Sequence, residues 1–529
     1  MRSWAEDSTS GVDRTRRTLI GAAAALGLAP GLARAGEAAG RRPRLPVAQA
    51  PDGKFSGAFD GQALAFRGIR YATAERFRAP VRVSRPGETM EAREFGPVCP
   101  QQGGYSPQSE DCLYLNVWTS DLAPAVPRPV LLYIHGGAYS TGSVTDPLND
   151  GGALVRRTGC VVVTVNHRLN ALGYLYLARF DERFADSGNL GQLDLIAALQ
   201  WVRRNIAAFG GDPNCITPFG QSGGGAKIAT LMGMPAAAGL FHRACTMSGQ
   251  QVTASGPMHA TERARAYLAR LGVAENRLDP LLTMPVERLV EALDTRDPIL
   301  GGGVYFGPVL DMKWLVRHPF WPDANPQSNA MPMMLGNTQD ETRAFIDPAS
   351  DKVRGLTWDN LAERLAPDMR VDILPEWVVA QYRAHFPADT PQQLFYRATT
   401  AARSWRGQVE EADARAAAGA KATWVYQLDF QAPLAPERGA FHTLDIPLMF
   451  GTLGAEGSKT GTGPEARALS DAMMDALAGF ARTGRAPWAP YALPDRATMM
   501  FDTNRRVVND PRKWERELFA RVPYIQPGS

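Results

Sequence analysis

Residues 215–233, "CITPFGQSGGGAKIATLMG", place an apolar run, a glycine-rich turn and an apolar helical stretch in direct succession. The turn "GQSGG" has the Gly-x-Ser-x-Gly spacing of a sharp strand-to-helix turn that lifts a serine hydroxyl clear of a sheet. Glycines two positions either side of Ser222 leave room for a strained backbone. The segment predicts a strand, a turn carrying an exposed nucleophile, and a helix. A plain glycine-rich loop is the alternative, so the rest of the chain must supply the context.

The same alternation of apolar runs and helical stretches continues along the chain. Val/Leu/Ile-rich runs predict strands buried on both faces of a parallel sheet, and apolar residues at helical spacing predict helices between them. The predicted strands are 128–137, 159–170, 331–337 and 422–430, and the predicted helices are 190–210 and 464–484, the latter as the final helix. We therefore expect an α/β fold with a mostly parallel central sheet flanked by helices. Helix-rich stretches near 255–300 and 350–420 are expected to be insertions over the site, because strands flank them.

The first 35 residues have the pattern of an export signal. A twin arginine, Arg16-Arg17, precedes a mildly apolar run over 19–32 and an Ala-Arg-Ala cleavage site at 33–35. The run is too short to span a membrane, although a membrane-anchoring helix is the alternative. We expect a twin-arginine signal over 1–35, a flexible lead-in over 36–50 and a catalytic domain over 51–529. The mature protein is then periplasmic or secreted, without a stable membrane anchor.

Charge and cysteine usage narrow the possible partners. The net charge of +3 is small for 529 residues, so nothing indicates nucleic-acid binding. The seven histidines do not cluster at metal-ligand spacing, so we expect no metal or cofactor. Cys99 and Cys112 lie in a segment rich in Pro, Gly and Gln and are the best candidates for a disulfide in an exported protein. The other three cysteines, Cys160, Cys215 and Cys245, are expected to be single thiols, and the sequence does not indicate an oligomeric state.

A serine nucleophile needs hydrogen-bond donors for an oxyanion, a base and an acid that orients the base. Gly136 and Gly137 follow a predicted strand, and Gly223 follows the serine at a helix N-terminus, so their amides are the candidate oxyanion donors. A strand-ending turn is the other interpretation of the first two. Four histidines beyond the serine helix and the segment after it are candidate bases: His259, His318, His385 and His442. Position favours His442, which lies in a loop after a strand. Asp340 and Glu341, also just beyond a strand, are both candidate acids.

Several longer motifs then point to one family. "EDCLYLNVW" (110–118), the segment 188–227 around the serine, "HGGAYSTG" and "GAFHTLDIPLMFG" occur in the order seen in type B carboxylesterases, which include para-nitrobenzyl esterases and cholinesterases. The chain resembles this family over about 51–505. The resemblance implies an α/β-hydrolase fold and a carboxylic ester hydrolase that acts on small molecules through an acyl-enzyme. It implies Ser222 as nucleophile, Glu341 as acid and His442 as base, and it matches Cys99–Cys112 to the family's first disulfide.

The chain departs from the family at three positions beside the site. Gln221 replaces the usual Glu, which removes a negative charge and favours a neutral ester over a cholinesterase-like cation. Gly223 replaces Ala but keeps its amide. Thr342 replaces a glycine after the acid, so Asp340 stays open as the orienting acid. Hydrolysis of amides, carbamates or lactones on the same site remains an alternative. A non-catalytic binding protein of this fold is disfavoured, because serine, acid, histidine and oxyanion glycines are all present.

Overall fold

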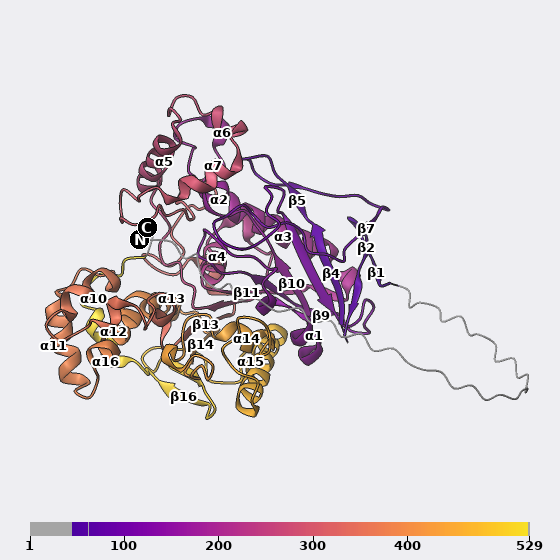
Figure 1. The fold of residues 1–529 in the computed structure, drawn as a ribbon. Helices are drawn as coiled ribbons and strands as arrows, with labels where there is room; N and C mark the ends of the chain where they lie inside the picture. Colours follow the sequence, from indigo (N-terminus) through magenta and orange to yellow (C-terminus); the bar gives the residue numbers. More distant parts are fainter. Residues whose placement is uncertain (1–44, 62, 527–529) are drawn as a thin grey trace, which may run out of the picture. The chain divides into compact units, whose positions relative to one another are not determined.

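One mixed sheet forms the centre of the structure, a computed structural model that describes residues 45–61 and 63–526 (Figure 1). The predicted export signal lies outside the described residues. The sheet's strands follow one another in the order β16 (Arg506–Asn509), β15 (Ala497–Phe501), β14 (Thr423–Leu428), β13 (Met333–Thr338), β12 (Ala244–Met247), β11 (Gly211–Gln221), β9 (Arg128–Ile134), β10 (Val161–Val165), β8 (Tyr114–Thr119), β4 (Ala63–Arg70) and β3 (Ala58–Asp60). All strands from β15 to β10 pair in parallel, and both ends of the sheet are antiparallel. The α/β prediction is confirmed.

Both faces of the sheet are covered, and strand β9 shows why. Its side chains alternate between the two faces, as the two-residue period of a strand requires. Val130, Leu132 and Ile134 belong to the core beneath α3 (Leu190–Asn205) and α4 (Gly223–Met232), whereas Leu131 and Tyr133 belong to the core on the opposite face. The helices of that second face are α1 (Gly152–Thr158), α14 (Asp445–Phe450) and α15 (Pro464–Thr483). Burial on both sides explains the continuous apolar runs of the central strands.

Helical insertions add to this framework in the two predicted regions. The first holds α5 (Pro257–Leu271), α6 (Pro280–Thr283) and α7 (Val286–Glu291). The second holds α9 (Asp351–Arg354), α10 (Leu361–Met369), α11 (Pro375–His385), α12 (Pro391–Thr399), the π-helical turn η7 (Thr400–Trp405) and α13 (Arg406–Ala417). Figure 1 shows α10, α11 and α12 gathered with α16 (Lys513–Phe519), and these helices share a small apolar core of their own. Two short helices, α2 (Asn170–Tyr174) and α8 (Pro326–Asn329), complete the set.

Two elements near the ends of the chain differ from the sequence-based expectation. Val47–Ala50, placed in the flexible lead-in, form strand β1, which pairs with β2 (Gly53–Ser56) and through it joins β7 (Thr89–Glu91). Backbone hydrogen bonds to β2, which follows within a few residues, hold this segment in place. The segment contains few apolar residues, so its sequence did not predict a strand. The helix predicted at the end of the chain is α15, but α16 follows it. A hairpin of β5 (Ala72–Thr73) and β6 (Val81–Arg82) lies outside both sheets.

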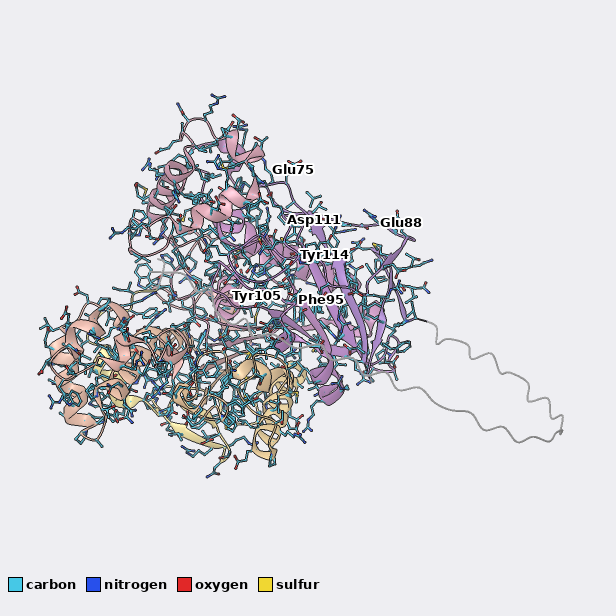
Figure 2. All side chains as sticks on the ribbon, viewed as in Figure 1. Glu75, Glu88, Phe95, Tyr105, Asp111 and Tyr114 are labelled. Atoms are coloured by element: carbon cyan, nitrogen blue, oxygen red, sulfur yellow. The ribbon has the colours of Figure 1, made fainter. Side chains whose placement is uncertain are left out.

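The segment between β7 and β8 carries the two cysteines predicted to pair. Figure 2 marks Phe95, Tyr105 and Asp111 along it. Cys99 and Cys112 are both buried and are free thiols in the structure, so the predicted bond is not formed there. The two thiols are nevertheless neighbours. A hydrogen bond to Cys99, together with burial, raises the pKa of the Cys112 thiol. The other three cysteines are also free thiols.

Candidate functional site

Ser222 occupies the junction of β11 and α4, as the motif predicted. Its backbone angles, φ 56° and ψ −125°, lie in a region that costs free energy for a residue with a side chain. The Ser222 N–H donates to the Met247 carbonyl at 2.7 Å, which ties the turn to strand β12. A Cβ atom on Gly224 would lie 1.9 Å from the Ile134 carbonyl oxygen, and one on Gly220 would lie 2.7 Å from the Gly224 backbone. The glycines therefore allow the close backbone contacts that hold the serine in this conformation.

His442 and Glu341 meet at the carboxyl edge of the sheet. Glu341 begins the short turn η6 (Glu341–Ala344) after β13, and His442 lies in the loop after the neighbouring strand β14. The His442 Nδ1 atom contacts the Glu341 carboxylate directly, and both side chains are buried. A buried carboxylate in this position fixes the ring orientation and stabilises its protonated form.

Three further donors hold the Glu341 carboxylate. Its Oε1 atom accepts hydrogen bonds from Ser248 Oγ at 2.6 Å, from the Thr338 N–H at 2.7 Å and from Asn337 Nδ2 at 3.1 Å. Burial alone would raise the pKa of Glu341, but the charge and hydrogen bond of His442 and the other donors bring the pKa below its usual value of 4.5. Glu341 is therefore a carboxylate at neutral pH.

Asp340, the alternative acid, has a different position. Its Oδ2 atom accepts from the Ala440 N–H at 3.0 Å, and its own N–H donates to the Ala440 carbonyl at 2.9 Å. Its Oδ1 atom pairs with Arg343 Nε at 3.2 Å. Asp340 thus fastens the backbone of the histidine loop and makes no hydrogen bond to the imidazole.

The other three candidate histidines lie away from this pair. His318 accepts a hydrogen bond from the Ala254 N–H, His385 stacks on Trp514 with ring centroids 4.2 Å apart, and His259 is on the exposed side of α5. None of them lines the cavity that holds the serine.

The second ring nitrogen of His442 faces Gln221. The two Nε2 atoms lie 3.1 Å apart. An imidazole that donates from Nδ1 to Glu341 carries a lone pair on Nε2, so the Gln221 amide N–H donates to it. Ser222 and His442 line the same cavity, but in the part of the chain that the structure describes no hydrogen bond joins them. The sequence analysis assigned Gln221 a role through its lack of charge and did not predict this hydrogen bond to His442.

Of the candidate oxyanion donors, Gly223 lines the cavity that holds Ser222 and His442, whereas Gly136 and Gly137 line a second cavity together with Gln221. A Cβ on Gly136 would lie 3.2 Å from the Ser222 Cβ, and one on Gly223 would lie 2.0 Å from the Ala138 carbonyl oxygen, so neither position tolerates a side chain without movement. Gly137 adopts φ +83°, which favours glycine. Within residues 45–61 and 63–526, the amides of these three glycines have no hydrogen-bond acceptor. They are free to bind an oxyanion.

Lys227 is a further buried residue of this site. It lies on α4, and its Nζ donates to the Ala138 carbonyl at 2.7 Å and to the His135 carbonyl at 3.4 Å, on either side of the two oxyanion glycines. The ammonium also lies 5.2 Å from the Tyr139 ring centroid. Burial lowers the pKa of Lys227 from 10.5 to about 7. The sequence does contain a signal for this residue, because a lysine stands alone in a helix of otherwise small and apolar residues. The sequence analysis did not use it.

A cavity of about 150 Å³ holds both Ser222 and His442. Its lining includes Ser222, Gly223, His442, Tyr139, Ser248, Tyr305, Phe345, Arg403, Ser404 and Tyr524. Across the described part of the chain, no group of three or more His, Cys, Asp or Glu side chains is arranged to hold a metal ion. Nor does any described helix combine the length and apolar character needed to cross a membrane.

Comparison with known proteins agrees with this geometry. The sequence model of the carboxylesterase family matches residues 44–517. The para-nitrobenzyl esterase of Bacillus subtilis is 35% identical over 493 residues, which cover 88% of this chain and 96% of that protein. A probable N-octanoylanthranilate hydrolase of Rhodococcus erythropolis is 34% identical over 429 residues, 76% of this chain and 84% of that protein. The crystal structure of a Geobacillus stearothermophilus carboxylesterase superposes with a TM-score of 0.79 at 35% identity, covering 89% of this chain and 99% of that one.

Proposed function

Because the chain belongs to the carboxylesterase family and is a carboxylic ester hydrolase, we propose that it cleaves esters through an acyl-enzyme formed on Ser222. In this proposal His442 is the general base and Glu341 orients it. The amides of Gly136, Gly137 and Gly223 bind the oxyanion. The observation that carries the proposal is the strained serine in one cavity with an imidazole held by a buried carboxylate.

The reaction proceeds in two balanced steps. The Ser222 Oγ attacks the ester carbonyl while His442 Nε2 takes its proton, and the carbonyl electrons move onto the oxygen facing the three amides. Collapse of this intermediate expels the alcohol, which receives the proton from His442. Water then attacks the acyl-enzyme by the same route and releases the acid. The Gln221 amide must first leave Nε2, because the lone pair it occupies is the one that accepts the serine proton.

Labelling with a fluorophosphonate tests this assignment directly. We expect a single adduct on Ser222 by peptide mass spectrometry and loss of ester hydrolysis in Ser222→Ala. An adduct on another serine, or full activity in the variant, contradicts the proposal. An amide and a carbamate with the same acyl group, run beside the ester, separate the alternative hydrolase activities. Hydrolysis of the ester, the amide and the carbamate shares the attack step, but differs in the protonation of the leaving group.

Three further parts of the proposal concern the substrate's charge, the protein's location and a disulfide bond. Gln221 leaves no negative charge beside the acyl site, so we expect substrates without a positive charge. The twin-arginine pattern of residues 1–35 supports export to the periplasm or medium. The neighbouring thiols of Cys99 and Cys112 support formation of a disulfide after export.

A further inference from the structure

Arg403 brings a positive charge into the wall of the cavity that holds Ser222 and His442. It lies on the π-helical turn η7, which interrupts the helix formed by α12 and α13. Turns of this kind occur frequently at functional sites. Apart from His442, Arg403 is the only ionisable basic side chain among the residues that line the cavity, and no carboxylate lines it.

The guanidinium of Arg403 has no polar partner. Among the residues the structure describes, it forms no hydrogen bond and no ion pair, and its one recorded contact is with the Phe345 ring, 4.8 Å from the ring centroid. The buried arginines Arg168 and Arg415 are paired: Arg168 binds Asp194 at 2.7 Å, and Arg415 donates to four acceptors around it. Arg403 is partly exposed, and a partly desolvated cation without a polar partner is unfavourable, so an anion entering the cavity would gain this interaction without breaking another.

The position of Arg403 is tied to the catalytic residues. Phe345 lies between Arg403 and the imidazole, since its ring centroid is 4.7 Å from that of His442. Thr342, next to the acid, connects to η7 and the end of α12 through its hydroxyl, 2.8 Å from Thr399 Oγ1 and 2.9 Å from Thr400 Oγ1. The departure from glycine at position 342 therefore links the acid turn to the segment that carries the arginine.

Neighbouring charges reinforce the positive field. Burial, together with the charge of Arg370, lowers the pKa of Arg403 to about 10, so the guanidinium stays charged at neutral pH. The two carboxylates that oppose this effect are engaged elsewhere: Asp368 with Lys352 and Glu341 with His442. Gln221 adds no negative charge on the other side of the imidazole.

From this arrangement we propose that Arg403 binds a carboxylate on the substrate, and that the preferred substrates are esters carrying a carboxylate group near the scissile bond. A guanidinium matches a carboxylate through two parallel N–H···O bonds, which gives orientation as well as attraction. The inference rests on the proposed esterase function and replaces the expectation of a neutral ester with an anionic one. Exclusion of cationic esters, expected from Gln221, is retained.

Two matched ester pairs test the inference, one for each side of the ester bond. p-Nitrophenyl hemiglutarate is compared with p-nitrophenyl hexanoate for a carboxylate on the acyl group. The butyrate ester of 4-hydroxybenzoate is compared with that of methyl 4-hydroxybenzoate for one on the alcohol. We expect kcat/KM to favour the carboxylate member of at least one pair by about 10-fold to 100-fold, the size of a hydrogen-bonded charge pair.

Variants at the arginine assign the preference. In Arg403→Gln the ratio of kcat/KM between each carboxylate ester and its neutral counterpart falls to about one, and Arg403→Lys retains part of the preference. Arg354→Gln is the matched control, because Arg354 is exposed, pairs only with an exposed Asp351 and does not line the cavity. Equal kcat/KM within both pairs in the unmodified enzyme, or an equal loss for charged and neutral esters in Arg403→Gln, overturns the inference.

Inhibition of the unmodified enzyme gives a readout that needs no variant to fold. 4-Hydroxybenzoate or glutarate should inhibit hydrolysis of a neutral ester competitively, and the corresponding amides, 4-hydroxybenzamide and glutaramide, about tenfold less strongly. Equal inhibition by acid and amide counts against carboxylate binding. Fluorophosphonate labelling of Ser222 and turnover of the neutral esters report on the esterase function alone, so its failure is distinguishable from failure of the inference.

Discussion

The Nε2 atoms of Gln221 and His442 lie 3.1 Å apart, on the side of the imidazole that accepts the Ser222 proton in the proposed mechanism. His442 Nδ1 is engaged by Glu341, so the neutral ring has its lone pair at Nε2 and the amide of Gln221 donates to it. The residue before Ser222 is therefore a hydrogen-bond partner of the proposed base. Its chemistry should affect both the charge preference of the site and the pH at which the base works.

Gln221→Glu places a carboxylate beside the imidazole. We expect kcat/KM for a choline-like ester to rise relative to a neutral ester of equal acyl length, by about fivefold or ~1 kcal/mol. The acid limb of the pH profile of kcat/KM should move to higher pH, because the carboxylate stabilises the imidazolium, which cannot act as base. Equal gains for both esters, or an unchanged acid limb, would show that this position sets neither property.

Glu341→Gln and Asp340→Asn distinguish the two acidic residues of the acid turn. Glu341→Gln removes the charge that orients and stabilises the imidazolium, so kcat should fall by roughly 10³-fold or more. Asp340→Asn retains an acceptor for the Ala440 N–H, so its kcat should stay within about tenfold of the wild type. Steady-state kinetics with a p-nitrophenyl ester measures both, and the reverse order of effects would assign the orienting role to Asp340.

The Glu341 pair also predicts a pH dependence of stability. Its folded-state pKa lies below the usual value of 4.5, so the carboxylate contributes stability above about pH 4.5, and this contribution is lost as the pH falls through the lower folded-state value. The free energy of unfolding of the wild type should therefore decline relative to Glu341→Gln as the pH is lowered from 5 to 3, by urea titration. A constant difference across this range would contradict the prediction.

Lys227→Met tests the buried lysine under the oxyanion loop. Without the hydrogen bonds to the Ala138 and His135 carbonyls, we expect kcat to fall about tenfold with a smaller change in KM. Ile228→Val, a buried change on the same helix, is the matched control for loss of packing, with an expected cost of about 1 kcal/mol in stability. If kcat falls by the same factor in both variants, the lysine has no specific role at the oxyanion loop.

Stability against pH supplies a second measurement for Lys227. Between pH 7 and 10.5 the unfolded chain keeps the proton that the buried lysine has largely lost, so rising pH favours the folded state. The free energy of unfolding of the wild type minus that of Lys227→Met should increase over this range, by at most about 1.4 kcal/mol per pH unit. A difference that falls with pH would show that the ammonium is stabilised inside the protein.

Cys99 and Cys112 should form a disulfide in exported protein. Alkylation before and after reduction, followed by mass spectrometry, should modify both only after reduction, while the half-buried Cys215 reacts in both samples. Replacing both with alanine should lower the free energy of unfolding by about 3 kcal/mol in the chain-entropy account. Alkylation of both thiols in unreduced exported material would remove the predicted bond.

Replacing Arg16-Arg17 with two lysines tests the export route. We expect the protein to remain in the cytoplasm, because the twin arginine distinguishes this signal from others. Arg41-Arg42, a second arginine pair beyond the predicted cleavage site, provides the matched control, and its replacement with lysines should leave export unchanged. Unchanged distribution of the first variant between cell fractions would exclude the twin-arginine route.

Local sequence determined the elements and the turn that carries Ser222. Strand-length apolar runs, helical periodicity and the spacing of glycines around Ser222 each depend on residues within one turn or one strand, so their backbone consequences can be predicted without neighbours in space. The strands β9, β10, β13 and β14 and the helices α3 and α15 were predicted on this basis. The parallel sheet followed from their alternation.

Only the tertiary structure decided which distant side chains meet. Glu341 and His442 are 101 positions apart and come together because β13 and β14 are neighbouring parallel strands, which turns Glu341 toward the ring and leaves Asp340 on the loop backbone. Arg403 enters the cavity through a π-helical turn that periodicity does not reveal, and no described residue forms a hydrogen bond or an ion pair with it. Charge pairing, burial and the partner of a ring nitrogen are properties of packed neighbours, and for that reason no reading of adjacent residues could supply them.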